Sequence, residues 1–136
     1  MRILLLLLVL AGAAGLVATR IEPFAPEAVL EPSVDLLGRA TPLRVVARDR
    51  GSGLRRVEIR LVAPGAEPAL VAAEDFPRRS WWGSEVHEAV LTPTVDANAA
   101  HVPEGSATLE VWATDHSWLS AMRHHPTLSR AVTVKL

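Results

Sequence analysis

Two arginines and two tryptophans stand almost side by side in the segment Phe76-Pro-Arg-Arg-Ser-Trp-Trp-Gly83. Guanidinium groups beside indole rings suit stacking on sugar rings or contact with lipid headgroups. A third tryptophan follows the strand that ends at Asp115 and can cover the same end of the domain. We therefore expect an exposed patch, which would mark a partner surface, made of Arg78, Arg79, Trp81, Trp82 and Trp118. The alternative is that one tryptophan closes the edge of the core while the arginines stay solvated.

Two aspartates end matching motifs. Leu43-Arg-Val-Val-Ala-Arg-Asp49 and Leu109-Glu-Val-Trp-Ala-Thr-Asp115 both follow the pattern L-x-V-x-A-x-D, and a short loop comes after each. A carboxylate at the end of a strand can accept hydrogen bonds from turn amides. The alternative is calcium, which takes about six to eight oxygen ligands, several of them from clustered carboxylates. Asp49 and Asp115 are isolated from other acids in sequence, which favours the turn role.

Histidines and serines offer no catalytic pattern. A zinc enzyme of the H-E-x-x-H type is excluded, and His124-His125 in a strand would point to opposite faces. Solvated loop positions are expected for all five histidines, which are His87, His101, His116, His124 and His125. Ser52, between Gly51 and Gly53, lies in no G-x-S-x-G motif and has no recognisable base. We expect no catalytic residue, no metal and no cofactor, and hence no enzyme activity.

Apolar residues with a period of two indicate the strands that hold these side chains. Alternation runs through 43–48, 56–61, 109–114 and 132–136, with weaker candidates at 28–31, 69–73 and 86–92. Such alternation places one face in a core and the other in water. About seven short antiparallel strands in about 110 residues predict an all-β, Ig-like sandwich over 33–136.

The first twenty residues are typical of an export segment. Arg2 precedes an uncharged apolar run over 3–19, which ends at Arg20. A positively charged start followed by an apolar run is the pattern of a secretory signal. The run also lies at the lower edge of the roughly 17–25 residues that an anchor needs to span a bilayer. Both a cleaved signal and an inner-membrane anchor therefore stay open for 1–20. A proline-rich spacer is expected over 21–32.

Composition limits the partners. The chain has 136 residues, 14 Lys and Arg against 15 Asp and Glu, and no cysteine. Near-balanced charge argues against nucleic-acid binding, which needs a basic face. The absence of cysteine excludes disulfide scaffolds and thiol catalysis.

The order of several motifs resembles the N-terminal, non-catalytic Ig-like region of membrane-anchored lysostaphin/LytM-type bacterial zinc metallopeptidases. The matching segments are 39–49, Gly51-Ser-Gly-Leu54, 57–61, Asp75-Phe-Pro77, 104–111, Ala113-Thr-Asp-His-Ser-Trp118 and Val132-Thr-Val134. Zinc ligands of the peptidase domain, an H-x(n)-D pair and an H-x-H motif, do not occur here in usable form. The resemblance therefore implies a setting and no reaction by these residues.

That setting is the cell envelope. The resemblance implies an exported accessory module, on the periplasmic face of the inner membrane or elsewhere in the envelope. Such a module would space or position a catalytic domain absent from this chain, with that peptidase domain or peptidoglycan as partner. The alternative is a stand-alone adhesive or glycan-binding sandwich that uses the Arg and Trp residues named above.

Overall fold

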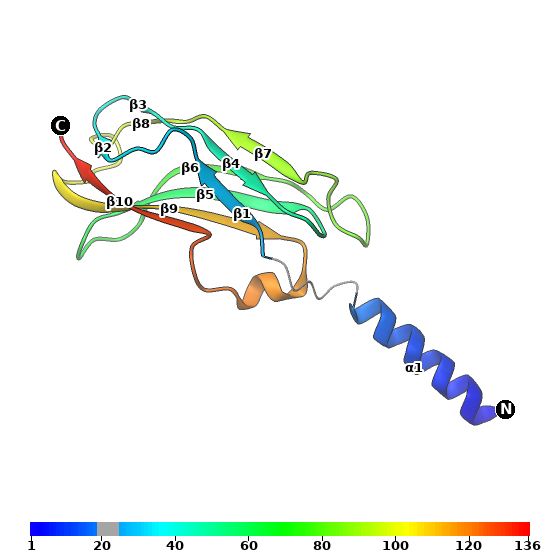
Figure 1. The fold of residues 1–136 in the computed structure, drawn as a ribbon. Coiled ribbons are helices and arrows are strands. Elements are labelled where there is room, and N and C mark those ends of the chain that lie inside the picture. The colour runs from blue at the N-terminus through cyan, green and yellow to red at the C-terminus, as the bar shows by residue number, and fades with distance from the viewer. Residues whose placement is uncertain (19–24) are drawn as a thin grey trace.

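The computed structural model describes residues 1–18 and 25–136. One α-helix precedes ten strands and a short 3-10 helix (Figure 1). In chain order these are α1 (Arg2–Ala18), β1 (Glu27–Leu30), β2 (Leu36–Leu37), β3 (Thr41–Pro42), β4 (Val45–Arg48), β5 (Leu54–Val62), β6 (Ala69–Asp75), β7 (Glu88–Leu91), β8 (Thr94–Val95), β9 (Gly105–Asp115), η1 (Trp118–Met122) and β10 (Leu128–Val134).

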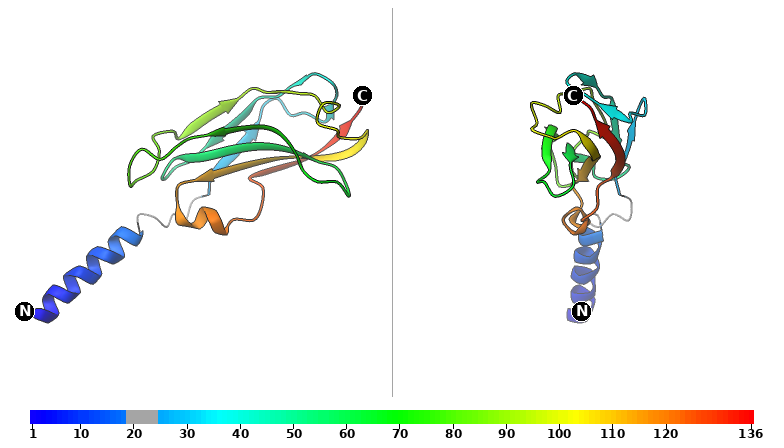
Figure 2. Two further views of the ribbon diagram at one scale, coloured as in Figure 1. Left: turned by 180° about the vertical axis from the view of Figure 1, so that it is seen from behind. Right: turned by 90° about the vertical axis from the view of Figure 1, so that its left-hand side faces the viewer.

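The strands form two facing sheets and a small ribbon. The smaller sheet has the order β1-β4-β7, and the larger has the order β2-β10-β9-β5-β6. Strands β3 and β8 pair with each other beside them. The views in Figure 2 show the two sheets as stacked layers, and β1 and β10 belong to different sheets. The fold is therefore mostly β and arranged as a sandwich.

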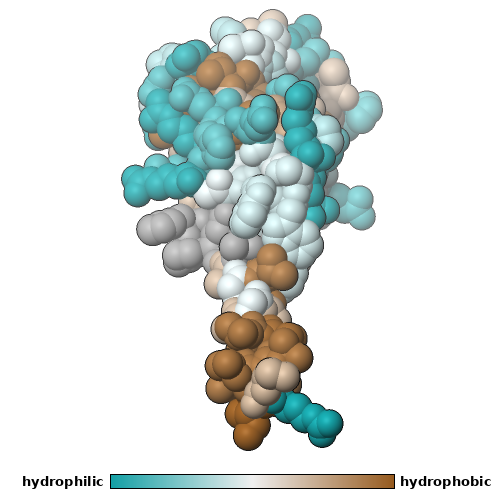
Figure 3. All heavy atoms as spheres, turned by 90° about the vertical axis from the view of Figure 1, so that its right-hand side faces the viewer, coloured by the Kyte–Doolittle hydropathy of each residue, from teal (hydrophilic) through white to brown (hydrophobic). Residues whose placement is uncertain are grey.

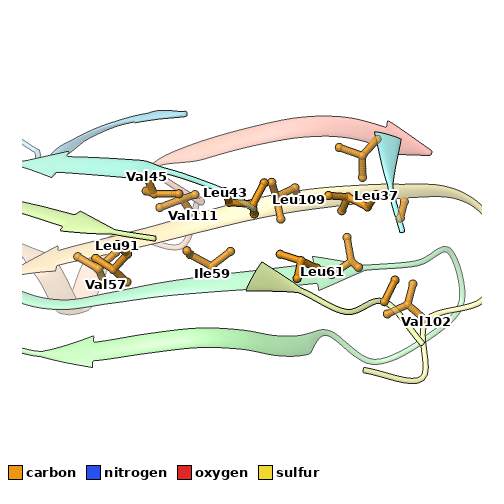
Figure 4. Close-up of a cluster of buried hydrophobic side chains, with 14 of the residues drawn as sticks. Leu37, Leu43, Val45, Val57, Ile59, Leu61, Leu91, Val102, Leu109 and Val111 are labelled. Carbon is orange, nitrogen blue, oxygen red and sulfur yellow. The ribbon is translucent and has the colours of Figure 1, made fainter. Parts of the chain in front are cut away.

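The core lies between the two sheets. Alternate residues of β5 and β9 are fully buried, among them Val57, Ile59 and Val111. Val45 and Leu91 of the smaller sheet point toward them (Figure 4). This is the period-two pattern that the sequence predicts, with apolar side chains inward and charged ones outward.

Helix α1 has no buried residue and is apolar from Ile3 to Ala18. Figure 3 shows its apolar surface, which contrasts with the more hydrophilic body. Among the described residues, no helix combines the length and the apolar character that crossing a membrane requires. The C-terminal end of the expected export segment and the first part of the expected spacer, residues 19–24, lie outside the described residues.

All seven predicted strands are present, but the structure departs from the prediction at several points. The three extra strands β2, β3 and β8 have two residues each, too few to show any periodicity. Strand β2 runs parallel to β10, so the sandwich is not purely antiparallel. Strand β1, which the sequence predicts near Ala28, lies inside the expected spacer, and the structure pairs it with β4.

The alternation over 43–48 predicts that Val46 faces water together with Arg44 and Arg48, and for Val46 this prediction is wrong. The residue is 4% exposed. Its neighbours across the smaller sheet are Val29 on β1 and Val90 on β7, and both of these are exposed. The outer face of this sheet thus carries a row of three valines. Val29 and Val90, on the two edge strands, cover Val46 on the central strand β4.

Candidate functional site

The candidate site lies at one end of the larger sheet. The register pairs Leu54 at the start of β5 with Asp115 at the end of β9. It also pairs Arg56 with Asp75 at the end of β6. The start of β5 and the loops that follow β6 and β9 therefore meet at one end of the sandwich, which we call the groove end (Figure 1).

The loop after β6 presents the predicted arginines and tryptophans on a tight turn. Main-chain hydrogen bonds join Ser80 and Gly83 in both directions, at 3.3 and 3.2 Å. The Ser80 hydroxyl also accepts a hydrogen bond from the amide of Trp82 at 3.2 Å. These bonds close the turn so that both tryptophans lie outside it, with Trp81 46% and Trp82 62% exposed.

The loop after β9 presents Trp118, which is 47% exposed. Asp115 is fully buried, and its carboxylate accepts hydrogen bonds from the Ser117 amide at 3.0 Å and from Arg123 Nη1 at 2.9 Å. The bond from Ser117 fixes the loop before η1, and the bond from Arg123 fixes the residue that follows η1. The turn role predicted for Asp115 is confirmed.

Two adjoining hollows lie between these loops. The outer hollow, about 510 Å³, is lined by Arg55, Asp75, Phe76, Pro77, Arg78 and His116. The inner hollow, about 330 Å³, is lined by Arg55, Arg78, Trp81, His116, Ser117, Trp118 and Ala121. Arg55, Arg78 and His116 border both hollows, which therefore form one depression. We call it the Arg/Trp groove.

Hydrogen bonds to and from Phe76 hold the walls of this groove together. The Phe76 amide donates to the Arg55 carbonyl oxygen at 2.8 Å. The His116 imidazole Nε2 lies 2.8 Å from the Phe76 carbonyl oxygen. A carbonyl oxygen only accepts, so Nε2 carries the proton. The chain of contacts joins β5, the loop after β6 and the loop after β9, so contacts within the protein hold the walls of the groove.

The structure brings together some of the predicted surface residues and not others. Arg78, Trp81 and Trp118 line the inner hollow. Arg79 and Trp82 are exposed on the same turn but do not line either hollow. The expectation that one tryptophan closes the core is not met, because all three are exposed.

Arg55 is a groove residue that is not among the predicted surface residues. It falls between Leu54 and Arg56, where the pairing of β5 with β9 shifts register. A bulge of this kind turns an extra side chain out of the regular alternation. Strict alternation predicts one polar residue between Leu54 and Val57, but the sequence has two arginines, Arg55 and Arg56. This extra polar residue is the feature of the sequence that could have indicated the bulge.

A buried polar cluster supports the groove from beneath. Gly53 donates its amide to Asp49 Oδ2 at 2.7 Å, which confirms the turn role of Asp49. Ser52 Oγ accepts a hydrogen bond from the His116 amide at 3.1 Å. Burial raises the pKa of the Asp49 carboxyl above its ordinary value, the Gly53 contact partly offsets this, and the nearby Asp115 raises it further. Asp49 Oδ1 is buried without a hydrogen-bond partner in the described part of the chain.

Four of the five histidines are exposed, as expected, whereas His116 is 7% exposed. The prediction is wrong for His116 because its main chain and its imidazole both bond to neighbouring loops. His124 and His125 line a separate hollow of about 470 Å³ beside Trp112. Within residues 1–18 and 25–136, no three His, Asp or Glu side chains come together as a group that could hold a metal ion.

Neither a protein-family model nor a curated protein sequence matches this chain.

Proposed function

We propose that this chain is an exported, non-catalytic accessory module of the cell envelope that binds an envelope polysaccharide in the Arg/Trp groove. The observation that carries the proposal is the joint lining of one hollow by Trp81, Trp118, Arg55 and Arg78. Exposed tryptophan faces are apolar platforms with polar edges, and arginines supply several donors in a fixed plane. Together they suit a ligand that has both ring faces and oxygen acceptors.

A non-catalytic role agrees with the contacts of the serine and histidine at this end. Ser52 Oγ is bonded to the main-chain amide of His116 and not to its imidazole. The imidazole instead bonds to the Phe76 carbonyl oxygen. A nucleophilic serine needs a base aimed at its hydroxyl, so this pair acts in the structure of the loops.

We further propose that the sandwich is Ig-like. The strand order supports this: three strands, β1-β4-β7, face the set β10-β9-β5-β6, and β2 runs parallel to β10. In the standard lettering these are A-B-E facing G-F-C-C′, with a second segment of the first strand added beside G. Helix α1 acts in this proposal as the export signal, because a positive start precedes an uncharged apolar run.

Co-sedimentation with insoluble envelope polysaccharide tests the proposed function. The full chain, held in a polyoxyethylene detergent that has no sugar headgroup, is mixed with purified peptidoglycan sacculi and with an envelope polysaccharide free of peptide. The proposal expects saturable binding to at least one of them. Failure to sediment with either polymer would contradict it.

A second candidate is the positioning of a catalytic domain of a peptidoglycan peptidase. The register places the start of β1 opposite the end of β4, at the groove end. It places the end of β10 opposite Gly105, at the other end of the sandwich. A segment that continued after Leu136 would therefore leave from the end remote from the groove, which suits a spacer. A longer gene product with a peptidase domain after this sandwich would support that role.

A further inference from the structure

Of the eleven arginines in residues 25–136, six form ion pairs with carboxylates, and the two that line the groove are among the other five. Ion pairs bind six arginines to carboxylates, namely Arg44, Arg48, Arg56, Arg60, Arg123 and Arg130. Among the described residues, no carboxylate forms an ion pair with Arg55 or Arg78. Both nonetheless border the same two hollows. Two guanidinium groups beside one depression repel each other unless an anion lies between them.

A carboxylate that lines the outer hollow with them is already engaged. Asp75 lines the outer hollow, and its Oδ1 accepts a hydrogen bond from Arg56 Nη1 at 2.7 Å. An ionised carboxylate only accepts hydrogen bonds. Asp75 therefore suits a hydroxyl donor on a ligand in the outer hollow and disfavours a second anion there.

The tryptophans indicate the second property of the ligand, which is a ring that can lie against an indole. Trp81 and Trp118 line the inner hollow next to the two arginines, and both are about half exposed. Their positions do not depend on the ligand, because the turn at Ser80 and the Asp115 contacts hold their loops. A saccharide ring can lie against these exposed ring faces, whereas a neutral sugar would leave the two guanidinium groups without a carboxylate to bind.

We infer that the Arg/Trp groove is selective for an acidic sugar, a pyranose that carries a carboxylate. The carboxylate lies between Arg55 and Arg78, because a guanidinium and a carboxylate form paired, charge-assisted hydrogen bonds. The ring lies against Trp81 and Trp118, and a ring hydroxyl donates to Asp75. This inference rests on the proposed function, since it names the class of saccharide that the same groove takes.

The test compares a polyuronate with its carboxyl-reduced, neutral form. Binding to the full chain is measured by isothermal titration or by co-sedimentation, for the wild type and for Arg55→Gln and Arg78→Gln. Arg39→Gln is the matched control, because Arg39 is exposed outside the groove. Each groove substitution is expected to weaken binding of the acidic polymer about tenfold or more, since a hydrogen bond to a charged group is lost. The control should leave binding unchanged.

The neutral polymer separates the two proposals. The inference expects the wild type to bind the neutral polymer about tenfold or more weakly than the acidic one, because both guanidinium groups lose the carboxylate. Equal binding of acidic and neutral polymers would overturn the acidic selectivity and leave the proposed function standing. This arm needs only the wild type, so it decides the matter even if a variant fails to fold.

Two further ligands distinguish between the two natural sources of a sugar carboxylate. Peptide-free glycan strands of peptidoglycan carry the lactyl carboxylate on every second sugar, whereas an uronic acid polymer carries it on the ring carbon. Binding to either one, with the arginine dependence above, supports the inference and names the source. Arginine-independent binding to both would contradict it.

Discussion

The imidazole of His116 donates a hydrogen bond from Nε2 to the carbonyl oxygen of Phe76, across a distance of 2.8 Å. The two residues are 40 positions apart in the chain. This bond joins the loop that carries Trp118 to the loop that carries Arg78 and Trp81. It explains how two loops with little regular structure can form one groove.

Replacing His116 by alanine is expected to destabilise the fold and to widen the groove. The substitution leaves the part-buried Phe76 carbonyl oxygen without its donor, which costs about 1 kcal/mol in the free energy of unfolding. Chemical denaturation of the full chain measures this loss. His125→Ala, at an exposed position, is the control and should cost under about 0.5 kcal/mol. Equal costs for the two variants would argue against the bracing role of His116.

Gly83 is predicted to tolerate no side chain. A Cβ built on it would lie 1.9 Å from the Ser52 carbonyl oxygen, and its φ is +120°. Gly83→Ala should therefore lower the free energy of unfolding by about 2–3 kcal/mol or more, from strain and displacement of the turn.

Gly65→Ala is the matched control for Gly83. Gly65 also has a positive φ, of +71°, but no atom lies within 4 Å of a built Cβ. Only the backbone cost of about 1 kcal/mol applies there. Thermal or chemical unfolding that ranks Gly65→Ala as the more damaging variant would contradict the close contact of Gly83 with Ser52.

The free energy of unfolding of Asp49→Asn, relative to that of the wild type, should increase as the pH rises. The folded-state pKa of Asp49 lies above its ordinary value of 3.8, chiefly through burial. Between those two values the folded state binds more protons than the unfolded state, so the contribution of Asp49 to stability falls as pH increases. The amide of asparagine does not ionise, so the variant escapes this loss.

The measurement is the difference in unfolding free energy between Asp49→Asn and the wild type at a series of pH values. Taking this difference cancels the contributions of other titrating groups, such as Glu58, because they are the same in both proteins. Burial opposes the charge of Glu58, but hydrogen bonds from Arg56 and Arg60 outweigh it and lower its pKa. A difference that stays flat from pH 4 to pH 8, or that falls, would contradict the burial effect on Asp49.

Arg123 is expected to matter more for stability than a surface arginine does. Its Nη1 lies 2.9 Å from Oδ2 of Asp115, whose side chain is fully buried. Arg123→Met should cost about 2 kcal/mol, because a charged acceptor is left buried without this donor.

Arg130→Met is the control for Arg123. Its partner Asp35 has a side chain that is 81% exposed, so this exposed pair is worth under about 1 kcal/mol. Urea denaturation gives both values. Equal losses would indicate that Asp115 finds another donor when Arg123 is removed.

The long strands and the aromatic patch could be predicted from the sequence, and the reasons are physical. Strands β5 and β9 alternate strictly because one of their faces is buried, so Ile59 and Val111 could be placed in the core. Trp81 and Trp118 could be placed at one end of the fold, because turn residues and strand ends bracket them.

The rest depends on contacts between distant segments. Arg55 enters the groove because of a register shift that involves β9, and no local pattern encodes that shift. The burial of His116 depends on Gly53 and Phe76, both far from it in the chain. Val46 is buried on the outer face of its sheet because of two neighbouring strands, which alternation within one strand does not reveal.

Binding of an acidic polysaccharide by tryptophan variants tests the central claim most directly. The full chain, Trp81→Ala, Trp118→Ala and Trp82→Ala are titrated with the same polyuronate or peptidoglycan glycan strands. Trp82 is the matched control, since it is exposed on the same turn but does not line the hollows. The account predicts a loss of about tenfold or more for Trp81→Ala and for Trp118→Ala, from about 1–3 kcal/mol of stacking by analogy with aromatic platforms for bases, and little change for Trp82→Ala. Unchanged affinity in both groove variants, or a larger loss in Trp82→Ala than in either, would contradict it.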